Sequence, residues 1–184
     1  MNHMIPDLYQ RLHSYVSEFN AEDDELYPQL ITNDKAYDYL AAQAPLLDCP
    51  DKTIERTYYY RWWTLRKHWK ETPDGHILTE FHPDVGWAGP YNSINAAVGH
   101  HLRETRWLTE PEKWVREYIS FWLDRKGDTL SYSMWYASAL EDYLLLHPDS
   151  DFEGACLDKL ISLYEDRSAK NAHSSGLYWS QDGR

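Results

Sequence analysis

One short segment concentrates the side chains that could contact a ligand. Six aromatic rings fall within the twelve positions 58–69, and arginine and lysine residues lie among them. Tyrosine and tryptophan rings beside hydrogen-bonding groups suit a ligand that is apolar on its faces and polar at its edges, as sugars are. The segment therefore predicts sugar contacts from Arg61 and Trp62. The alternative is that these rings pack in a core, where a carboxylate such as Glu104 would hold Arg61.

A loop further along the chain supplies the next candidates. Residues 82–92 include two prolines and two glycines, which predicts an irregular connection of the kind that carries ligand contacts. Core packing gives little reason for an indole at Trp87, and the side-chain amide of Asn92 suits sugar hydroxyls. Trp135 completes the predicted substrate-binding set, although packing inside a helical layer is the favoured interpretation for this ring.

No side chain is assigned as catalytic or as a metal ligand. Glu80, Asp84 and Glu104 are carboxylates that could approach a sugar, and Asp182 lies nearest the end of the chain. Adjacent histidines on a helix point about 100° apart, so the His100-His101 pair is not expected to chelate an ion. The acidic run 149–154 resembles a calcium loop, but Leu160 stands where that loop needs a bidentate glutamate. We therefore expect neither metal nor cofactor.

The bulk composition limits the kinds of partner that the protein is expected to bind. The chain has 184 residues, enough for one domain with a substantial core, and its net charge of -12 disfavours binding to nucleic acid. No apolar run reaches the roughly 20 residues that cross a bilayer, and no secretory signal is evident. Two isolated cysteines do not make a disulfide framework. These features predict a cytoplasmic protein with a small carbohydrate ligand and no membrane association.

Apolar spacing and turn residues predict an all-α fold. Asn33 and Asp51 are expected to cap helices, Pro111 to lie in the first turn of another, and Thr72-Pro-Asp-Gly75 to form a turn before a short strand or extended arm. Short links between helices predict antiparallel hairpins, arranged in a wet outer layer and a dry inner layer. The seven predicted helices cover residues 6–19, 33–44, 51–71, 93–108, 111–125, 131–146 and 150–169.

Nine short motifs follow one another along the chain. They are Tyr58-Tyr-Tyr-Arg-Trp-Trp63, Arg66-Lys-His68, Thr72-Pro-Asp-Gly75, Thr79-Glu-Phe81, Trp87-Ala-Gly89, Tyr91-Asn92, Gly99-His-His101, Arg106-Trp-Leu108 and Gly176-Leu-Tyr-Trp179. Taken in order, these motifs resemble the six-hairpin (α/α)6 toroid glycoside hydrolases, and within them the mannosylglycerate-hydrolase-like and trehalase-like groups. The resemblance implies an N-terminal helical extension over 1–32 and a partial toroid over 33–184, with the short arm and loop at 76–92 inserted.

The resemblance also implies a reaction, the inverting hydrolysis of a glycosidic bond by one carboxylic acid and one carboxylate. The general acid of this family follows an element like Gly176–Trp179, so we expect this chain to be an incomplete N-terminal portion that supplies sugar-binding residues. Trehalose is a doubtful substrate, because Arg61 lies near the position where trehalases carry an aspartate.

Two other interpretations remain open. The chain could be a non-catalytic helical module for carbohydrate binding or assembly, or one half of an enzyme formed from two chains. An open half-toroid would expose aromatic rings, and proteins usually cover such surfaces. The partner expected for that surface is either a second copy of the chain or a missing C-terminal half.

Overall fold

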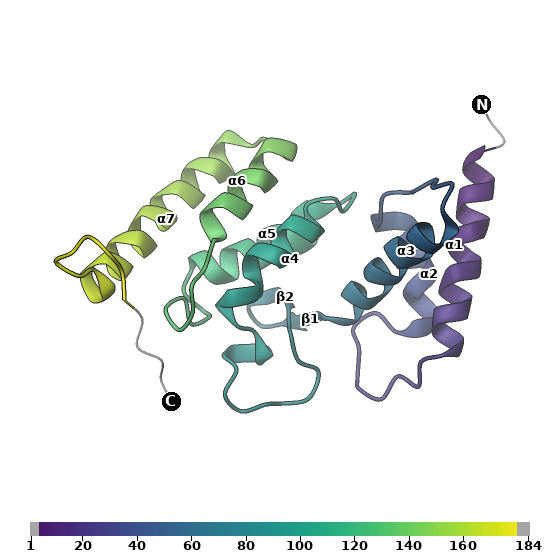
Figure 1. The fold of residues 1–184 in the computed structure, drawn as a ribbon, viewed down its shortest axis with the longest axis horizontal. Coiled ribbons are helices and arrows are strands. Elements are labelled where there is room, and N and C mark those ends of the chain that lie inside the picture. The colour runs from purple at the N-terminus through teal and green to yellow at the C-terminus, as the bar shows by residue number, and fades with distance from the viewer. Residues whose placement is uncertain (1–3, 180–184) are drawn as a thin grey trace.

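Seven α-helices, two 3-10 turns and one β-hairpin make up residues 4–179, the part of the chain that the computed structural model describes (Figure 1). The predicted all-α class is confirmed, with the small hairpin as its only sheet in that range. In these residues we find no helix with the length and apolar character to cross a bilayer. The elements are α1 Met4–Ala21, α2 Asn33–Gln43, α3 Lys52–Lys67, β1 Trp69–Thr72, β2 Gly75–Leu78, η1 Pro90–Asn92, η2 Asn95–Ala97, α4 Val98–Thr105, α5 Pro111–Leu123, α6 Tyr136–Leu146 and α7 Ser150–Asn171.

The first three helices pack together at one end of the molecule (Figure 1). Leu12, Val16 and Phe19 lie one above another on α1 at helical spacing, and all three are buried against this group. The predicted cap at Asp51 is confirmed, because its carboxylate accepts the backbone N–H groups of Thr53 and Ile54 at the start of α3. These contacts fix α3, which carries most of the aromatic segment.

The β-hairpin joins the three-helix group to the rest of the chain. We expected α3 to continue to residue 71, but it ends at Lys67 and the chain turns into β1. The backbone N–H and C=O groups form antiparallel strand hydrogen bonds instead of helical ones, in a register that runs from Trp69 opposite Leu78 to Thr72 opposite Gly75. Gly75 closes the turn with a φ of 100°, a conformation that glycine adopts readily. The hairpin then packs against α5, so it bridges the two ends of the molecule.

Two other predicted helices begin later than expected. The helix predicted over 93–108 is preceded by the 3-10 turns, and regular α4 starts only at Val98. The helix predicted from Ser131 starts at Tyr136, because the Asp128 carboxylate accepts the N–H groups of Leu130 and Ser131 and holds a turn there. Trp135 therefore lies just before α6, and its carbonyl accepts the N–H of Ala139 at 3.4 Å.

The last two helices form the other end of the molecule (Figure 1). α6 packs on α4, and α7 packs on α5. The helix predicted from residue 150 is confirmed, and the side chain of Asp149 caps it by accepting the N–H groups of Asp151 and Phe152. Only Cys156 and Leu163 of the 22 residues in α7 are buried, so most of this helix remains exposed.

The core is built from large rings. Tyr59, Trp62, Trp63 and Trp69 from the aromatic segment are all buried, as are Tyr118 and Trp122 of α5. Arg66, the fully buried cation among them, donates to the side-chain oxygen of Gln29 at 3.1 Å and to acceptors on Ile31 and Asn33. The irregular stretch between α1 and α2 is thereby tied to α3.

Candidate functional site

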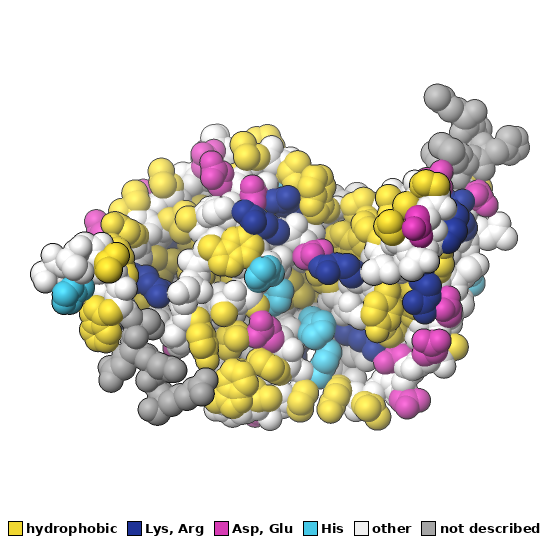
Figure 2. All heavy atoms as spheres, viewed as in Figure 1, with side chains coloured by type: hydrophobic (Ala, Val, Ile, Leu, Met, Phe, Trp, Pro, Cys, Tyr) yellow, Lys and Arg dark blue, Asp and Glu magenta, His cyan; other side chains and the backbone are white. Residues whose placement is uncertain are grey.

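A cavity of about 640 Å³ opens between the three-helix group and the rest of the molecule. Figure 2 shows histidine, acidic and basic side chains gathered near the centre of the face on which these two parts meet. The volume lies within the range of small-molecule sites, which run from about 300 to about 1,000 Å³. We call this cavity the central pocket; it is lined by Arg61, Thr64, Leu65, His68, Leu78, Thr79, Glu80, Phe81, His100, His101 and Glu104.

Three elements position these side chains. The C-terminal half of α3 contributes one wall, the end of β2 and the residues after it contribute the floor, and α4 contributes the opposite wall. The hairpin sets the spacing between the walls, because it leaves α3 at His68 and returns at Thr79. The N–H of Thr79 donates to the carbonyl of His68 at 3.0 Å, which extends the hairpin pairing into the pocket.

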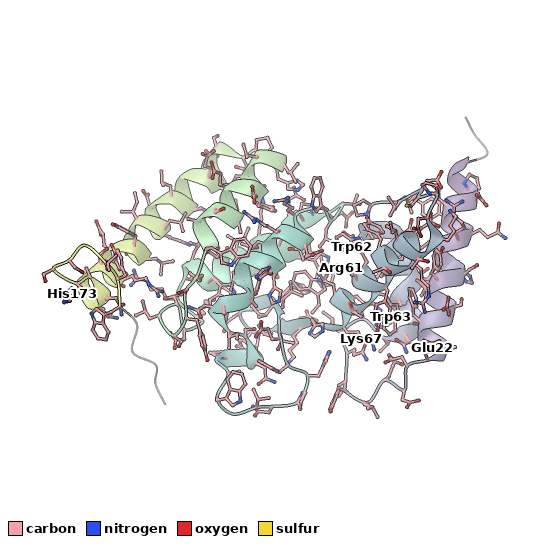
Figure 3. All side chains as sticks on the ribbon, in the orientation of Figure 1. Glu22, Arg61, Trp62, Trp63, Lys67 and His173 are labelled. Atoms are coloured by element: carbon pink, nitrogen blue, oxygen red, sulfur yellow. The ribbon has the colours of Figure 1, made fainter. Side chains whose placement is uncertain are left out.

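An ion pair spans the mouth of the pocket. Arg61 projects from α3 toward α4 (Figure 3), where its Nη2 donates to Oε1 of Glu104. The two side chains are 63% and 42% exposed, so both remain accessible to a ligand. The pairing with Glu104 that the core-packing interpretation anticipated does occur, but on the surface of a pocket. A guanidinium and a carboxylate in this position offer both donors and acceptors to a polyol.

Glu80 is a second carboxylate of the pocket, and the loop that follows holds it in place. Its N–H donates to the carbonyl of Asn92 at 3.3 Å, and the hydroxyl of buried Thr79 donates to the same carbonyl at 2.8 Å. Burial raises the pKa of the Glu80 carboxyl, and nearby His100 opposes that shift. The two carboxylates of the pocket therefore lie in different environments, one paired with a cation and one partly desolvated.

Two histidines of the pocket wall are held by hydrogen bonds. Nδ1 of His68 lies 2.8 Å from the carbonyl of Thr79, so this nitrogen carries the proton and Nε2 is left as an acceptor. Nδ1 of His101 lies 2.8 Å from the hydroxyl of Tyr118, which is buried on α5. Burial lowers the pKa of His68 and lowers that of His101 to about 4, so both rings are neutral at neutral pH.

The structure does not bring the five predicted substrate-binding residues into one pocket. Arg61 lines the central pocket, whereas Trp62, its neighbour on α3, is 6% exposed and belongs to the core. Trp87 is 62% exposed, and its ring meets the edge of Phe81, a pocket residue, at a centroid distance of 5.0 Å. The indole therefore stands beside the pocket floor without lining it.

Asn92 has a structural role in the loop after β2. Its amide nitrogen donates to the carbonyls of Phe81 at 3.2 Å and Pro83 at 2.8 Å, and it adopts a positive φ of 58°. The amide hydrogens that we expected to meet a sugar are thus used to fold residues 81–92. Asn92 also contributes to a smaller neighbouring cavity of about 420 Å³, together with Lys70, His82 and Asp84.

Trp135 supports the α4 wall from behind. Its ring meets that of His100 edge-on at 4.8 Å, and the guanidinium of Arg103 lies 4.4 Å from its centroid. A Cβ built on Gly99 would lie 2.5 Å from the indole, so the ring packs directly against a bare stretch of α4. Like Trp87 and Asn92, Trp135 therefore contacts a pocket residue without lining the pocket.

Sequence reasoning did not include the histidines, Glu80 or Glu104 in the predicted substrate-binding set, although all of them line the central pocket. The His100-His101 pair was interpreted as structural because it cannot chelate. In the structure His101 hydrogen-bonds Tyr118, and His100 meets the ring of Trp135 edge-on. Glu80 was recognisable within the Thr79-Glu-Phe81 motif, where a carboxylate follows an alternating arm. Asp182 lies outside the described residues.

Residues 4–179 contain no group of three or more histidine, cysteine, aspartate or glutamate side chains placed to hold a metal ion. The exposed and partly buried histidines of the central pocket instead face hydrogen-bond partners or aromatic rings, as described above. The chemistry that this pocket offers is hydrogen bonding to a polar ligand beside the ring of Phe81.

Comparison with known proteins identifies one similar solved structure. A chain named as a sialidase superimposes with a TM-score of 0.85 at 37% sequence identity, over 95% of the present chain. The match covers 17% of that structure, so the present chain corresponds to a small part of its length. No protein-family model matches the sequence, and no curated protein matches it. The chain thus shares the fold of one segment of a larger, sugar-acting protein.

Proposed function

We propose that this chain is a portion of a glycoside hydrolase and that the central pocket contacts the sugar. The observation that carries the proposal is the pocket itself, in which Arg61, Glu80 and Glu104 converge from three elements beside the ring of Phe81. Carboxylates accept hydrogen bonds from hydroxyls, and a guanidinium donates to ring or hydroxyl oxygens. The similarity to part of a sialidase supports a carbohydrate as the ligand.

The (α/α)6 toroid and the inverting mechanism belong to the proposal. Inversion needs an acid on the leaving oxygen and a base that activates water. The motif resemblance implies that the acid follows the Gly176–Trp179 element. Glu80 and Glu104 are accordingly proposed as ligands of sugar hydroxyls. We expect the 184-residue chain to bind sugar without hydrolysing aryl glycosides, and turnover that is lost in Glu80→Gln would instead make Glu80 catalytic.

The binding claim is tested by filling the pocket. Thr64 lines the pocket on α3, so Thr64→Trp should remove sugar-induced shifts of the histidine ring signals in NMR spectra. Thr57→Trp places the same indole two turns earlier on the same helix, at an exposed position, and is the matched control. Equal shifts in both variants would show that the sugar binds elsewhere.

A second candidate function is assembly with another polypeptide. The α6–α7 face, defined here by the exposed side chains of Leu145, Leu157, Ile161 and Tyr164, borders two grooves of about 410 and 400 Å³. Exposed apolar patches of this kind mark interaction sites. Light scattering tests it: we expect a concentration-dependent mass that Leu157→Glu reduces to that of one chain, and a monomer at all concentrations would contradict self-association.

A further inference from the structure

The charges of the central pocket restrict which sugars it accepts, if the pocket is the sugar site proposed above. Arg61 is the permanent cation among its described lining residues, and it is already paired with Glu104. Glu80 adds a second carboxyl group without a cationic partner in that range. The lining therefore carries no excess positive charge that could balance an anionic ligand.

Two of the three histidines in the lining add no positive charge, and the third, His100, meets the ring of Trp135 edge-on. Even with a proton on His100, Arg61 and His100 together would only balance Glu80 and Glu104. His68 and His101 are held in neutral form at neutral pH by burial, which lowers the pKa of each ring. The proton on Nδ1 of His68 is used by the carbonyl of Thr79, so that ring presents an acceptor. An acceptor attracts a hydroxyl and repels a carboxylate.

The cations that surround the pocket have carboxylate partners of their own. Lys67 on α3 pairs with Asp23, away from the pocket, and Arg103 on α4 pairs with Asp142 through Nε at 2.7 Å. Arg106 shares Asp142 at 3.0 Å. Recruiting any of these side chains to an anionic ligand would break an existing pair.

Lys70 lies in the neighbouring cavity instead of the central pocket. It shares that cavity with Asp84, whose charge acts on the ammonium group. Burial lowers the pKa of Lys70, so the surroundings of this ammonium disfavour its charged form. Lys70 does not supply the missing charge to the central pocket.

From this arrangement we infer that the central pocket binds a neutral saccharide, whose hydroxyls donate to Glu80 and Glu104, and that it discriminates against sugars carrying a carboxylate. An anion bound in the pocket needs a cation or several donors directed at it, and two nearby carboxylates add repulsion. The similar solved structure is named as a sialidase, and sialic acids carry a carboxylate. The ligand inferred for this chain is therefore a neutral sugar, whereas the name of the similar structure would suggest an acidic one.

The test compares two ligands that differ at one carbon. Methyl glucoside and methyl glucuronide share a ring and differ by a hydroxymethyl against a carboxylate at C6, and the galactose pair and N-acetylneuraminic acid extend the series. In NMR titrations at neutral pH and low salt, we expect the neutral ligands to bind at least about ten-fold more tightly than their acidic counterparts. Equal or tighter binding of the acidic sugars would overturn the inference.

A charge variant provides an independent check. Glu104→Gln removes one carboxylate and leaves Arg61 unpaired, so the preference for neutral over acidic sugars should shrink or reverse. Glu141→Gln, an exposed change on α6 beside a different groove, is the matched control and should leave the preference unchanged. An unaltered preference in Glu104→Gln would contradict the charge argument. Binding of neither ligand class to the unmodified chain would remove the proposed sugar site itself, an outcome distinct from a preference for acidic sugars.

Discussion

The aromatic segment 58–69 buries most of its rings, whereas the α6–α7 face leaves its apolar side chains exposed. On α3 and the hairpin, the rings of Tyr59, Trp62, Trp63 and Trp69 are sealed from solvent. On α6 and α7, the side chains of the α6–α7 face stand in solvent, with Leu145 75% exposed. The richest aromatic segment is therefore the scaffold, and a plainer leucine-rich segment carries the open apolar surface. A high density of rings identifies the core of this protein better than it identifies a binding surface.

The central pocket lies between these two regions and resembles neither. Its lining mixes ion-paired, carboxylate and imidazole groups with the single ring of Phe81. The sealed side provides rigidity, because α3 is fixed by its capped N-terminus and by the buried Arg66. The functional groups thus stand on the polar edge of a rigid aromatic helix.

The largest contrast in stability should come from one apolar side chain on each side, Trp69 on β1 and Leu157 on α7. Trp69 is fully buried and its Nε1 donates to the hydroxyl of Tyr39 at 3.0 Å, whereas Leu157 on α7 is 54% exposed. We expect Trp69→Ala to lower the free energy of unfolding by about 3–5 kcal/mol. Leu157→Ala should cost less than about 1 kcal/mol. Urea denaturation of the two variants decides this, and comparable losses would mean that the α6–α7 face is covered in solution.

The second largest difference in the free energy of unfolding is expected between substitutions of two arginines on α3. Arg66 is fully buried with acceptors from three residues, and Arg56 on the same helix is an exposed partner of Glu18. Arg66→Met leaves the buried carbonyl of Ile31 and two partly buried acceptors without their donor and should cost about 2–4 kcal/mol. Arg56→Met should cost at most about 1 kcal/mol, as for other surface pairs. Denaturant midpoints measure both effects. A small effect at Arg66 would mean that residues 22–32, which Arg66 ties to α3, do not unfold together with the rest of the protein.

The pocket itself should make stability depend on pH. The pKa of His101 is lowered by burial from 6.5 to about 4, so the unfolded chain binds a proton in this interval that the folded chain does not. The contribution of this ring to stability is therefore full above pH 6.5 and decreases as the pH falls toward 4, by about 3 kcal/mol. His101→Gln keeps a group that can bond Tyr118 and should flatten the profile between these values. An unchanged slope would assign the titration to other groups, such as His82, whose pKa is also about 4.

The smallest change in stability is expected at Trp87. Because its ring is 62% exposed, Trp87→Ala should alter the melting temperature little, corresponding to less than about 0.5 kcal/mol. Sugar affinity is the informative second measurement on this variant. A loss of affinity at unchanged stability would place the indole against the bound ligand, as the sequence predicted, and no loss would leave Trp87 as a surface residue beside Phe81.

Local signals in the sequence were sufficient for most of the fold. The cap at Asp51 and the turn at Thr72–Gly75 act through neighbouring backbone groups, so their effect is readable from the residues themselves. The cap expected at Asn33 is wrong, because Asn33 is the first residue of α2 and Thr32 precedes it. The strand at Trp69 was missed because the apolar spacing of α3 continues through it. Pairing with Leu78 decides the conformation there, and a helical pattern carries no trace of that partner.

The pocket was less predictable because its members meet only in three dimensions. Arg61 and Glu104 are separated by 43 positions, and Glu80 reaches them through the hairpin. The sequence identified Arg61 for its chemistry but could not show that its neighbour Trp62 turns inward, because adjacent helical positions differ by about 100° around the axis. Asn92 has the amide that the sequence suggested for sugar binding, but that amide donates its hydrogen bonds to carbonyls of its own loop.

Because Trp135 lies very close to Gly99, the residue type allowed at one of these two positions depends on the residue type at the other. An indole against a residue with no side chain leaves no room for even a methyl group, since the nearest ring carbons would lie 2.5 Å from it. Alanine at 99 would force the ring or the helix to move, and the wall bearing His100 would shift with it. Homologous chains that retain tryptophan at 135 are therefore expected to retain glycine at 99, and chains that lose one are expected to vary at the other.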